Sequence, residues 1–485
     1  DGWDYVSCRR KGARAIARVR AGEGPGLIHA RVTRPYSHSS ADSQAKYRDA
    51  EELASEVEHD PIDVLERQLI DAGLLDDEQA SSIRAEASAI AMQAAEEALA
   101  ARRPDPASVT NEVVRLPLMT VVDSHAEVVE TEEVAKTAGA AGEEKPGSVV
   151  MAEAIRLTLH ELLASDERIR VFGEDVADAD DEVLSQVEGK GGVFGVTRGL
   201  QRKFGSARCF NAPLAESNIV GRGVGQALRG LKPCAEIQFF DYIWPAMQQL
   251  RSEAATIRWR SQGSFSCPLV VRVAIGGYLT GGSIWHSQSG ESIFAHVPGL
   301  LIAFPSRSRD AVGLLRTAFA LDDPVLFLEH KHLYRQHYAA DPMPPPGWTV
   351  PFGHGTVVRR GRDLTIVTWG ATVQKSLMAA AQLEADGFQA EVVDLRTISP
   401  WDKELVAASV QHTSRLLVVH EDTITAGFGA EVAAWAGENC FWDLDAPVRR
   451  VGATDTFVAY EPTLEAAILP QVDDIVSGAR SLVER

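Results

Sequence analysis

The sequence has few cysteines and no long apolar run. Its five cysteines, Cys8, Cys209, Cys234, Cys267 and Cys440, are scattered over 485 residues without a paired spacing, which excludes a disulfide framework and a cysteine-based zinc site. No apolar stretch approaches the ~20 residues that a membrane helix needs. These absences predict a protein of a reducing compartment, the cytoplasm of a bacterium or an organelle matrix, with no targeting signal in this chain and no membrane partner.

Positive charge is scarce as well. The chain carries 48 Lys and Arg against 68 Asp and Glu, a formal net charge of -20, which is the opposite of what a nucleic-acid phosphate backbone selects. Hydrophobic residues make up 45% and charged residues 24%, which is typical of globular proteins and argues against wholesale disorder. At about 100–200 residues per domain the length predicts roughly three domains, and nucleic acid is not an expected partner.

The first residues lack an initiator Met and any apolar leader. Helical spacing begins at once, glycines at Gly22 and Gly24 end this helix, and 26–32 reads as a strand. A strand without a sheet of its own implies missing sequence or a partner chain. We therefore expect that the chain starts inside a domain.

Helices are predicted over about 61–72 and 76–101, after a polar loop at 36–43. The composition of 119–148 is acidic and rich in Ala and Gly, without an apolar period, which is typical of a linker. The linker therefore separates a mainly helical region from the rest of the chain.

From Val149 onward, helices and short apolar strands alternate, which indicates parallel sheets covered on both faces. A proline-rich stretch at 341–346 marks a second boundary. The predicted fold class is α/β, with two doubly wound sheet domains behind a mainly helical tail. The expected strands lie at 169–172, 269–273, 300–304, 325–328, 364–368, 390–393, 416–420 and 448–451, and the expected regions are 1–118, the linker 119–148, 149–341 and 342–485.

Glu216 is the first candidate for chemistry, because it directly precedes a Gly-rich helix start at 221–225. A carboxyl group held at a close-packed helix could be partly desolvated, and a raised pKa would let it share a proton. Taken alone, however, an acid at this place is more often a helix cap. The Gly-x-Gly-x-Gly run lacks the full dinucleotide fingerprint and is weak evidence for a nucleotide site.

Two histidines lie on loops that suit a ligand. His286 follows glycines at 276–277 and 281–282, which allow a loop to approach a ligand closely, and its imidazole can shuttle protons near neutral pH. A loop flanked by glycines can equally lack any function. His38 lies among serines that serve as turn formers, and an exposed loop histidine is commonly just solvated.

Aromatic residues follow the strand that begins near Glu236, including Phe240 and Tyr242. The carboxyl ends of strands are where open α/β sheets bind ligands, although core packing explains most aromatic clusters of this kind. Taken singly, none of these signals is decisive.

The order and the amino-acid sequences of these segments resemble those of one family. From about Val149 the chain is similar to the β subunit of the thiamine-diphosphate-dependent 2-oxoacid dehydrogenases, the decarboxylating component of the pyruvate and branched-chain complexes. Residues 1–111 resemble the C-terminal part of the α subunit, which suggests a fused gene. The matching strings are Phe172–Val176, Pro213–Glu216, Glu236–Phe239, Asp241–Ile243, His286–Ser289, Phe294–Gly299 and Gly427–Glu431, with His38–Asp42 and Lys46–Arg48 in the α-like part.

The resemblance implies a pyrimidine-binding domain, a transketolase C-terminal domain, and thiamine diphosphate with Mg²⁺ as cofactors. In this family an α-subunit domain with Gly-Asp-Gly holds the metal, and that motif does not occur in this sequence. We therefore expect no metal ligand among these residues and place the Mg²⁺ ligands in a missing N-terminal domain of a longer fused enzyme. The 485-residue chain could be inactive on its own.

The resemblance also assigns roles to single residues. Glu216 would hydrogen-bond the aminopyrimidine ring and favour its imino tautomer, while His286 and His38 would steady the 2-oxo acid and move protons. These three are the expected catalytic residues. The residues expected to bind the cofactor are Glu174, Leu214, Gln238, Phe240 and Tyr242.

The function implied is oxidative decarboxylation of a 2-oxo acid with transfer of the acyl group to the lipoyl group of an acyltransferase core. The wording of 236–239 and 241–243 favours branched-chain substrates. A pyruvate or acetoin dehydrogenase component, a distant transketolase-like enzyme and a non-catalytic assembly fragment remain alternatives. Because the family's sites lie between subunits, we expect a homodimer of the fused chain.

Overall fold

The computed structural model describes residues 1–37, 43–116, 146–179, 181–187 and 189–484. The chain forms two compact units, Asp1–Pro106 and Ala107–Arg485. The loop that contains His38 and nearly all of the expected linker at 119–148 lie outside the described residues. No helix within the described residues is both long enough and apolar enough to cross a bilayer.

The first unit is helical, as expected. Helix α1 begins after Asp4, whose carboxylate accepts a hydrogen bond of 2.8 Å from the backbone N–H of Ser7. Helix α4 begins with a reciprocal cap, in which Asp76 and Gln79 each accept from the other's backbone N–H. The helices of this unit are α1 (Tyr5–Arg20), η1 (Gln44–Lys46), α2 (Ala50–Glu58), α3 (Pro61–Asp71) and α4 (Asp77–Ala100), and η2 (Pro106–Thr110) follows them.

The strand expected over 26–32 is not present. This segment is irregular, and Gly2 donates a backbone hydrogen bond of 2.5 Å to the carbonyl of Arg31. An apolar run forms a strand only where a neighbouring backbone pairs with it along its length. No strand of the first unit's described residues offers that pairing, so this prediction was wrong.

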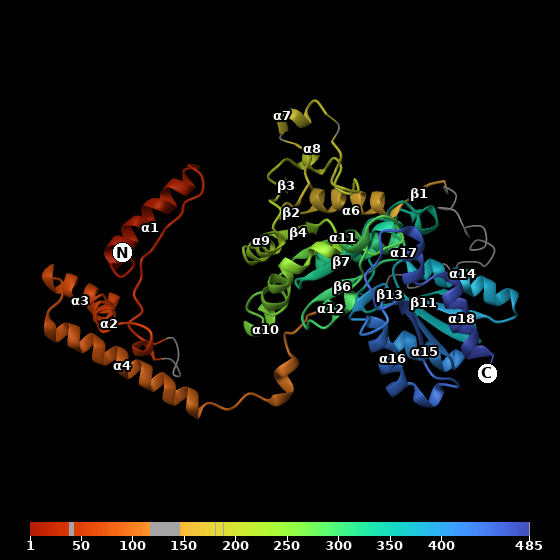
Figure 1. The fold of residues 1–485 in the computed structure, drawn as a ribbon. Helices are drawn as coiled ribbons and strands as arrows, with labels where there is room; N and C mark the ends of the chain where they lie inside the picture. Colours follow the sequence, from red (N-terminus) through yellow and green to blue (C-terminus); the bar gives the residue numbers. More distant parts are fainter. Residues whose placement is uncertain (38–42, 117–145, 180, 188, 485) are drawn as a thin grey trace. The chain divides into compact units, whose positions relative to one another are not determined.

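A seven-stranded sheet forms the first half of the second unit, in the order β12-β6-β7-β5-β4-β2-β3 (Figure 1). All neighbours are parallel except β12, which pairs antiparallel with β6. The strands are β2 (Ile169–Gly173), β3 (Cys209–Asn211), β4 (Lys232–Ile237), β5 (Val270–Ile275), β6 (Leu301–Ala303), β7 (Val325–His330) and β12 (Thr397–Ser399).

Strand side chains alternate between the two faces of this sheet. Val171 packs on the face covered by α6 (Met151–Ser165) and α13 (Ser308–Ala320), while Phe172 packs on the face covered by α9 (Glu216–Leu228). The shorter helical segments are α7 (Asp181–Leu184), α8 (Leu200–Phe204), η3 (Phe240–Tyr242), η4 (Trp244–Ala246), η5 (Gln249–Ala254), α10 (Ile257–Arg260), α11 (Ser283–His286), α12 (Glu291–Ala295), η6 (Lys331–Arg335) and η7 (His337–Ala339).

A second sheet of five strands has the order β14-β13-β10-β11-β9, with only β9 antiparallel. Helices α14 and α18 cover one face, and α15 and α16 cover the other. The elements are β9 (Thr356–Arg359), β10 (Leu364–Thr368), α14 (Thr372–Ala385), β11 (Ala390–Asp394), α15 (Lys403–Thr413), β13 (Leu416–Thr423), α16 (Phe428–Asn439), η8 (Phe441–Asp443), β14 (Arg449–Ala453), α17 (Pro462–Ile468) and α18 (Val472–Val483).

The two sheets share one hydrophobic cluster, which includes Ile219 beside the first sheet and Trp369 at the end of β10. A two-stranded pairing of β1 (Ser148–Val149) with β8 (Asp341–Pro342) joins the beginning and the end of the first sheet's segment. The predicted fold class, two sheets of α/β type behind a helical region, is therefore confirmed. The exact domain boundaries stay a prediction.

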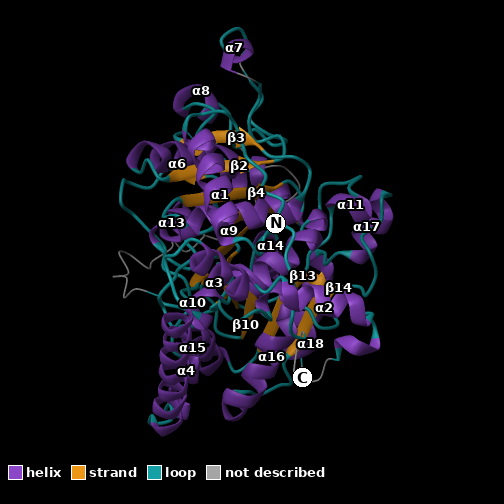
Figure 2. Ribbon diagram, turned by 90° about the vertical axis from the view of Figure 1, so that its left-hand side faces the viewer, coloured by secondary structure: helices purple, strands orange, loops and turns teal. Residues whose placement is uncertain are grey.

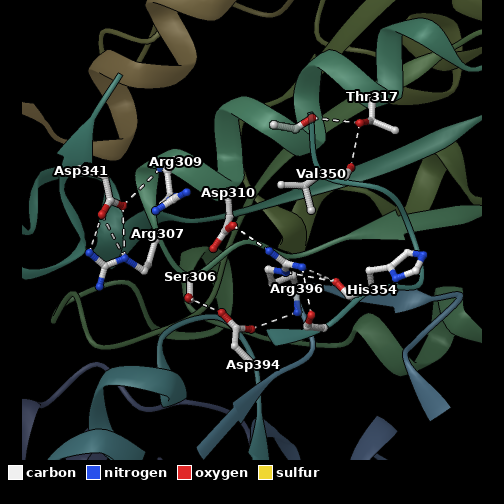
Figure 3. Close-up of polar contacts among 12 residues, drawn as sticks. Ser306, Arg307, Arg309, Asp310, Thr317, Asp341, Val350, His354, Asp394 and Arg396 are labelled. Carbon is white, nitrogen blue, oxygen red and sulfur yellow. Dashed lines mark hydrogen bonds and ion pairs between the residues drawn. The ribbon is translucent and has the colours of Figure 1, made fainter. Parts of the chain in front are cut away.

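A buried polar network also joins the two sheets (Figure 3). The guanidinium of Arg396 forms an ion pair of 3.1 Å with Asp310 of α13 and donates to the carbonyl oxygen of His354 at 2.8 and 3.1 Å. Asp394 accepts from the backbone N–H of Arg396 at 2.9 Å and from the hydroxyl of Ser306 at 2.5 Å. Burial, together with the charge of Asp310, raises the pKa of Asp394 to about 7.

Candidate functional site

The candidate residues gather at one edge of the seven-stranded sheet. Strands β2, β3, β4 and β5 are parallel, so their carboxyl ends meet at the same edge. Glu174 follows β2 directly, Gln238 follows β4, and His286 lies on α11 after β5. Open α/β sheets bind their ligands at this edge.

Glu216 is the first residue of α9, which begins after the short loop that follows β3. From the sequence, it was expected in front of the helix. It is 9% exposed, which is low for a carboxylate that forms no ion pair with any described residue. Helix α9 lies close to the sheet because Gly223 has no side chain: a Cβ there would stand 2.7 Å from a methyl carbon of Leu269. Gly223 thus allows the close packing of this helix on the sheet, which places Glu216 at the sheet edge.

Neighbouring carboxylates raise the pKa values of two groups here, Glu174 and Tyr242. Burial raises the pKa of Glu174, and the negative charges of Asp175 and Glu216 raise it further. Burial also raises the pKa of Tyr242, with added effects from Asp241, Glu174 and Glu216. Glu216 therefore lies close enough to both groups for its charge to act on them.

Gln238 links the ends of β4 and β2. Its side-chain amide donates to the backbone carbonyl of Glu174 at 3.2 Å and to the carboxylate of Asp175 at 3.4 Å. Asp175 has a φ of 53°, in the left-handed region. Asn211 of β3 holds the next part of the same loop, because its side chain exchanges two hydrogen bonds with the backbone of Ala177.

Tyr242 and His286 are in direct contact. The hydroxyl of Tyr242 lies 2.9 Å from Nε2 of His286, and the ring of Phe239 meets the imidazole edge to face, with the ring centroids 4.3 Å apart. Phe239 also contacts Phe194, at 5.6 Å between centroids. The imidazole is thus contacted by the ring of Phe239 and by the phenol of Tyr242.

The structure places the other candidates differently. Phe240 is only 1% exposed and packs in the core against Trp244 and Phe294. Leu214 is 72% exposed. His38 lies outside the described residues. The structure therefore brings together Glu174, Glu216, Gln238, Tyr242 and His286, with Phe239 rather than Phe240 as the aromatic neighbour.

Two residues of the site escaped the sequence analysis. The strand alternation of β4 stops at Ile237, and the backbone turns into η3, so that Phe240 faces the core and Phe239 faces the histidine. Asp241 is the second, because burial raises its pKa to about 6, partly offset by the backbone of Gln288. Its place between two aromatics in the sequence was the available signal.

A buried network of charged side chains links β4, β5 and β7 near this edge of the sheet. Arg272 of β5 makes two hydrogen bonds, of 2.6 and 2.7 Å, to Glu329 of β7 and one of 2.6 Å to Glu236 of β4. The hydroxyl of Tyr334 donates to Glu329 at 2.6 Å. Burial raises the pKa of Glu236, against the opposing effect of Arg272. The network ties three neighbouring strands together beside Gln238.

A surface hollow lies elsewhere in the same unit, between α12, α16 and the segment 398–403. None of the candidate residues lines it. Among the described residues no group of three or more His, Cys, Asp or Glu side chains is arranged to hold a metal ion.

Family models match three parts of the chain. Residues 1–107 match the dehydrogenase E1 component, residues 147–336 match the transketolase pyrimidine-binding domain, and residues 353–475 match the transketolase C-terminal domain. The first match covers the whole helical unit. The second covers every strand of the seven-stranded sheet except β12, and the third covers the five-stranded sheet together with β12.

Three related proteins are similar to this chain over most of their own length. The 2-oxoisovalerate dehydrogenase subunit beta of Bacillus subtilis is 44% identical over 333 residues, which is 68% of this chain and 98% of that protein. The mitochondrial 2-oxoisovalerate dehydrogenase subunit beta 2 of Arabidopsis thaliana is 43% identical, over 69% of this chain and 89% of that protein. The pyruvate dehydrogenase E1 component subunit beta of Bacillus subtilis is 40% identical, over 69% and 99%.

A split-gene transketolase, described as an inactive beta4 tetramer, superimposes with a TM-score of 0.54 at 24% identity. The match covers 70% of this chain and 99% of that chain. It supports the arrangement of the two sheets.

Proposed function

Because the chain belongs to the thiamine-diphosphate-dependent 2-oxoacid dehydrogenase E1 components, as an α-type tail followed by a β subunit, we propose that it takes part in the oxidative decarboxylation of a branched-chain 2-oxo acid. The acyl group would pass to the lipoyl group of an acyltransferase partner. The observation that carries the proposal is the convergence of Glu216, Gln238, Tyr242 and His286 at one sheet edge.

The described residues fit the ring end of thiamine diphosphate. Glu216 offers a buried carboxylate, Gln238 an amide, and Tyr242 a phenol with a polar tip and an apolar face. When bound, the cofactor supplies the nucleophilic carbon and the electron sink that decarboxylation requires.

Each side chain then has a defined task. Glu216 would hold a proton at a ring nitrogen of the aminopyrimidine, and Gln238 and Tyr242 would line that ring. His286 and, from the α-type part, His38 would orient the 2-oxo acid and move protons. Glu174, near Glu216, and the exposed Leu214 complete the pocket in this proposal.

Mg²⁺ is part of the proposed function, but we assign none of its ligands to the described residues. Mg²⁺ prefers oxygen ligands in octahedral geometry and usually binds through carboxylates and substrate phosphates. We place its ligands, and those of the diphosphate, outside the described part of the chain.

The proposed preference for branched-chain substrates rests on the amino-acid sequence of segments 236–239 and 241–243. Relatives named for 2-oxoisovalerate reach 44% identity, and relatives named for pyruvate reach 40%. A difference of this size leaves pyruvate as the second candidate substrate, and acetoin-type chemistry behind it.

An exposed apolar patch supports the proposed homodimer. It is formed by α11, by α17 and by the segment that precedes each helix, and the two helices lie side by side in Figure 1 and Figure 2. Val458 donates to the side chain of Gln288 at 3.2 Å, which ties the two segments together. Large apolar side chains with 43–72% exposure form this α11–α17 patch: Leu279, Ile284, Trp285, Phe457, Tyr460 and Leu464.

Large exposed apolar side chains on neighbouring segments commonly mark an interface. Since Trp285 directly precedes His286, a second copy of the chain seated here would cover the site next to the imidazole. Water would then be kept from the reaction, and each copy would complete the other's cofactor pocket.

The proposed location of the protein is the cytoplasm or an organelle matrix.

The test is a decarboxylation assay on the purified enzyme with thiamine diphosphate, Mg²⁺ and an artificial electron acceptor. 3-Methyl-2-oxobutanoate and pyruvate are compared by carbon dioxide release, and acyl transfer to a lipoylated domain is read by its mass. A higher kcat/KM for the branched acid supports the proposal. A preference for pyruvate would assign the second candidate, and no turnover of either acid would favour a non-catalytic assembly fragment.

A further inference from the structure

The contact between Tyr242 and His286 joins two separate segments of the sheet edge. Tyr242 ends η3 after β4, and His286 ends α11 after β5. The two side chains meet at 2.9 Å between the hydroxyl oxygen and Nε2. Nothing in the roles proposed above requires this hydrogen bond, because Tyr242 was assigned only to the pyrimidine ring.

The backbone that carries His286 is held independently of Tyr242. Gln288 donates its side-chain amide to the carbonyl of Ser283 at 3.0 Å, and Gly276 donates its N–H to the carbonyl of Gln288 at 3.2 Å. A Cβ at Gly282 would stand 2.1 Å from the hydroxyl of Ser287, so the turn requires glycine there. Loss of the Tyr242 hydroxyl therefore leaves the position of the loop in place.

The orientation of the imidazole ring depends on two neighbours. Phe239 packs edge to face on it at 4.3 Å between centroids, at an angle of 70°. Phe239 is apolar and restricts the ring plane without distinguishing the two ring nitrogens. Tyr242 does distinguish them, since its hydroxyl touches Nε2.

The direction of the hydrogen bond follows from the donors and acceptors. Tyr242 keeps its proton at neutral pH, because burial and three neighbouring carboxylates raise its pKa. A neutral imidazole has one nitrogen that donates and one that accepts. A phenol is a good donor, and the unprotonated imidazole nitrogen is a better acceptor than the phenol oxygen. The favoured arrangement is therefore Tyr242 O–H donating to Nε2.

We propose that Tyr242 is a positioning residue for His286: its hydroxyl fixes the imidazole tautomer with the proton on Nδ1. His286 then meets the 2-oxo acid first as a hydrogen-bond donor to a carboxylate or ketone oxygen. This assignment rests on the proposed function for the identity of the ligand, whereas the tautomer is a property of the chain alone.

The tautomer is measured directly on the 485-residue chain. Protein labelled with ¹⁵N-histidine is studied by two-bond proton–nitrogen correlation at pH 8, and the His286 signal is identified by its loss in His286→Asn. The Nδ1–H pattern is expected in the unaltered chain, and an increased share of the Nε2–H form in Tyr242→Phe. Tyr338→Phe, which removes a hydroxyl from η7, is the matched control and should leave the pattern unchanged.

Two outcomes overturn the proposal: an Nε2–H pattern in the unaltered chain, or the same tautomer in Tyr242→Phe. In the active enzyme, Tyr242→Phe should raise KM for the 2-oxo acid by about 2- to 10-fold, the range of one hydrogen bond. The tautomer is read without substrate. Failure of the enzyme to decarboxylate would therefore count against the proposed function and leave the result on Tyr242 standing.

Discussion

The indole nitrogen of Trp369 donates a hydrogen bond of 2.8 Å to a carboxylate oxygen of Glu291, across the junction of the two sheets. Glu291 begins α12 and is fully buried, and Trp369 directly follows β10. The next residue, Ser292, donates its hydroxyl to Asp422 of β13 at 2.7 Å. The segment that leads away from His286 is thus anchored on the five-stranded sheet.

Glu291 should make stability depend on pH. Burial, with the nearby charge of Asp422, raises the pKa of Glu291 to about 8. The folded protein therefore holds this proton to higher pH than the unfolded chain does. Its contribution to stability is complete at acidic pH and is lost as the pH rises through 8.

Glu291→Gln keeps an oxygen for Trp369 but cannot ionise. We expect the free energy of unfolding of this variant to fall less between pH 6 and pH 9 than that of the unaltered chain, as measured by urea denaturation. Glu438→Gln, an exposed change on α16, is the control. If the free energy of unfolding fell equally with pH in Glu291→Gln and in the unaltered chain, Glu291 would not be the group that holds the proton.

Arg396 should be among the residues most important for joining the sheets. Its side chain is 6% exposed and pairs with Asp310, which is 4% exposed (Figure 3). Removal of one partner leaves a buried charge, so Arg396→Ala should lower the free energy of unfolding by ~3–5 kcal/mol. Arg480→Ala removes an exposed pair with Asp386 and should cost much less. Similar losses in both variants would contradict the argument.

Most of the fold could be predicted from the sequence because its helices and longer strands carry periodic patterns of apolar residues. The helix at 61–72 and the strand at 390–393 differ from the structure by one residue at an end. Strands β1, β3, β8, β9 and β12 were not predicted, since two to four residues carry no period and their pairing is decided by tertiary contacts. The false strand at 26–32 had the apolar pattern of a strand but no partner.

The candidate site was accessible only in part. Glu216 and His286 stand out in the sequence by type and by neighbouring glycines, whereas their approach to Glu174 and Tyr242 depends on the order of the strands. The exchange of Phe239 for Phe240 has a local cause, because one turn of η3 reverses which ring faces the core. A pattern of apolar residues cannot show that reversal.

The α11–α17 patch should decide the oligomeric state. In the double variant Trp285→Lys and Tyr460→Lys, two charges replace rings that are 61% and 70% exposed. Charges buried in an interface without partners oppose association, so light scattering should show a monomer where the unaltered chain forms a dimer. Phe265→Lys, in the loop before β5, is the control and should remain dimeric. A monomeric unaltered chain would contradict the homodimer.

Glu216→Gln tests the central role in the proposed chemistry. The change preserves size and leaves the start of α9 intact, so the unfolding midpoint should stay close to that of the unaltered protein. An amide cannot share a proton with the pyrimidine nitrogen, and activity should fall by about 10²- to 10⁴-fold, the usual contribution of a positioned acid or base. The direct measurement is hydrogen–deuterium exchange at the reactive carbon of bound thiamine diphosphate, followed by NMR after acid quench. Glu438→Gln should exchange at the unaltered rate, and an unaltered rate in Glu216→Gln itself would remove Glu216 from the mechanism.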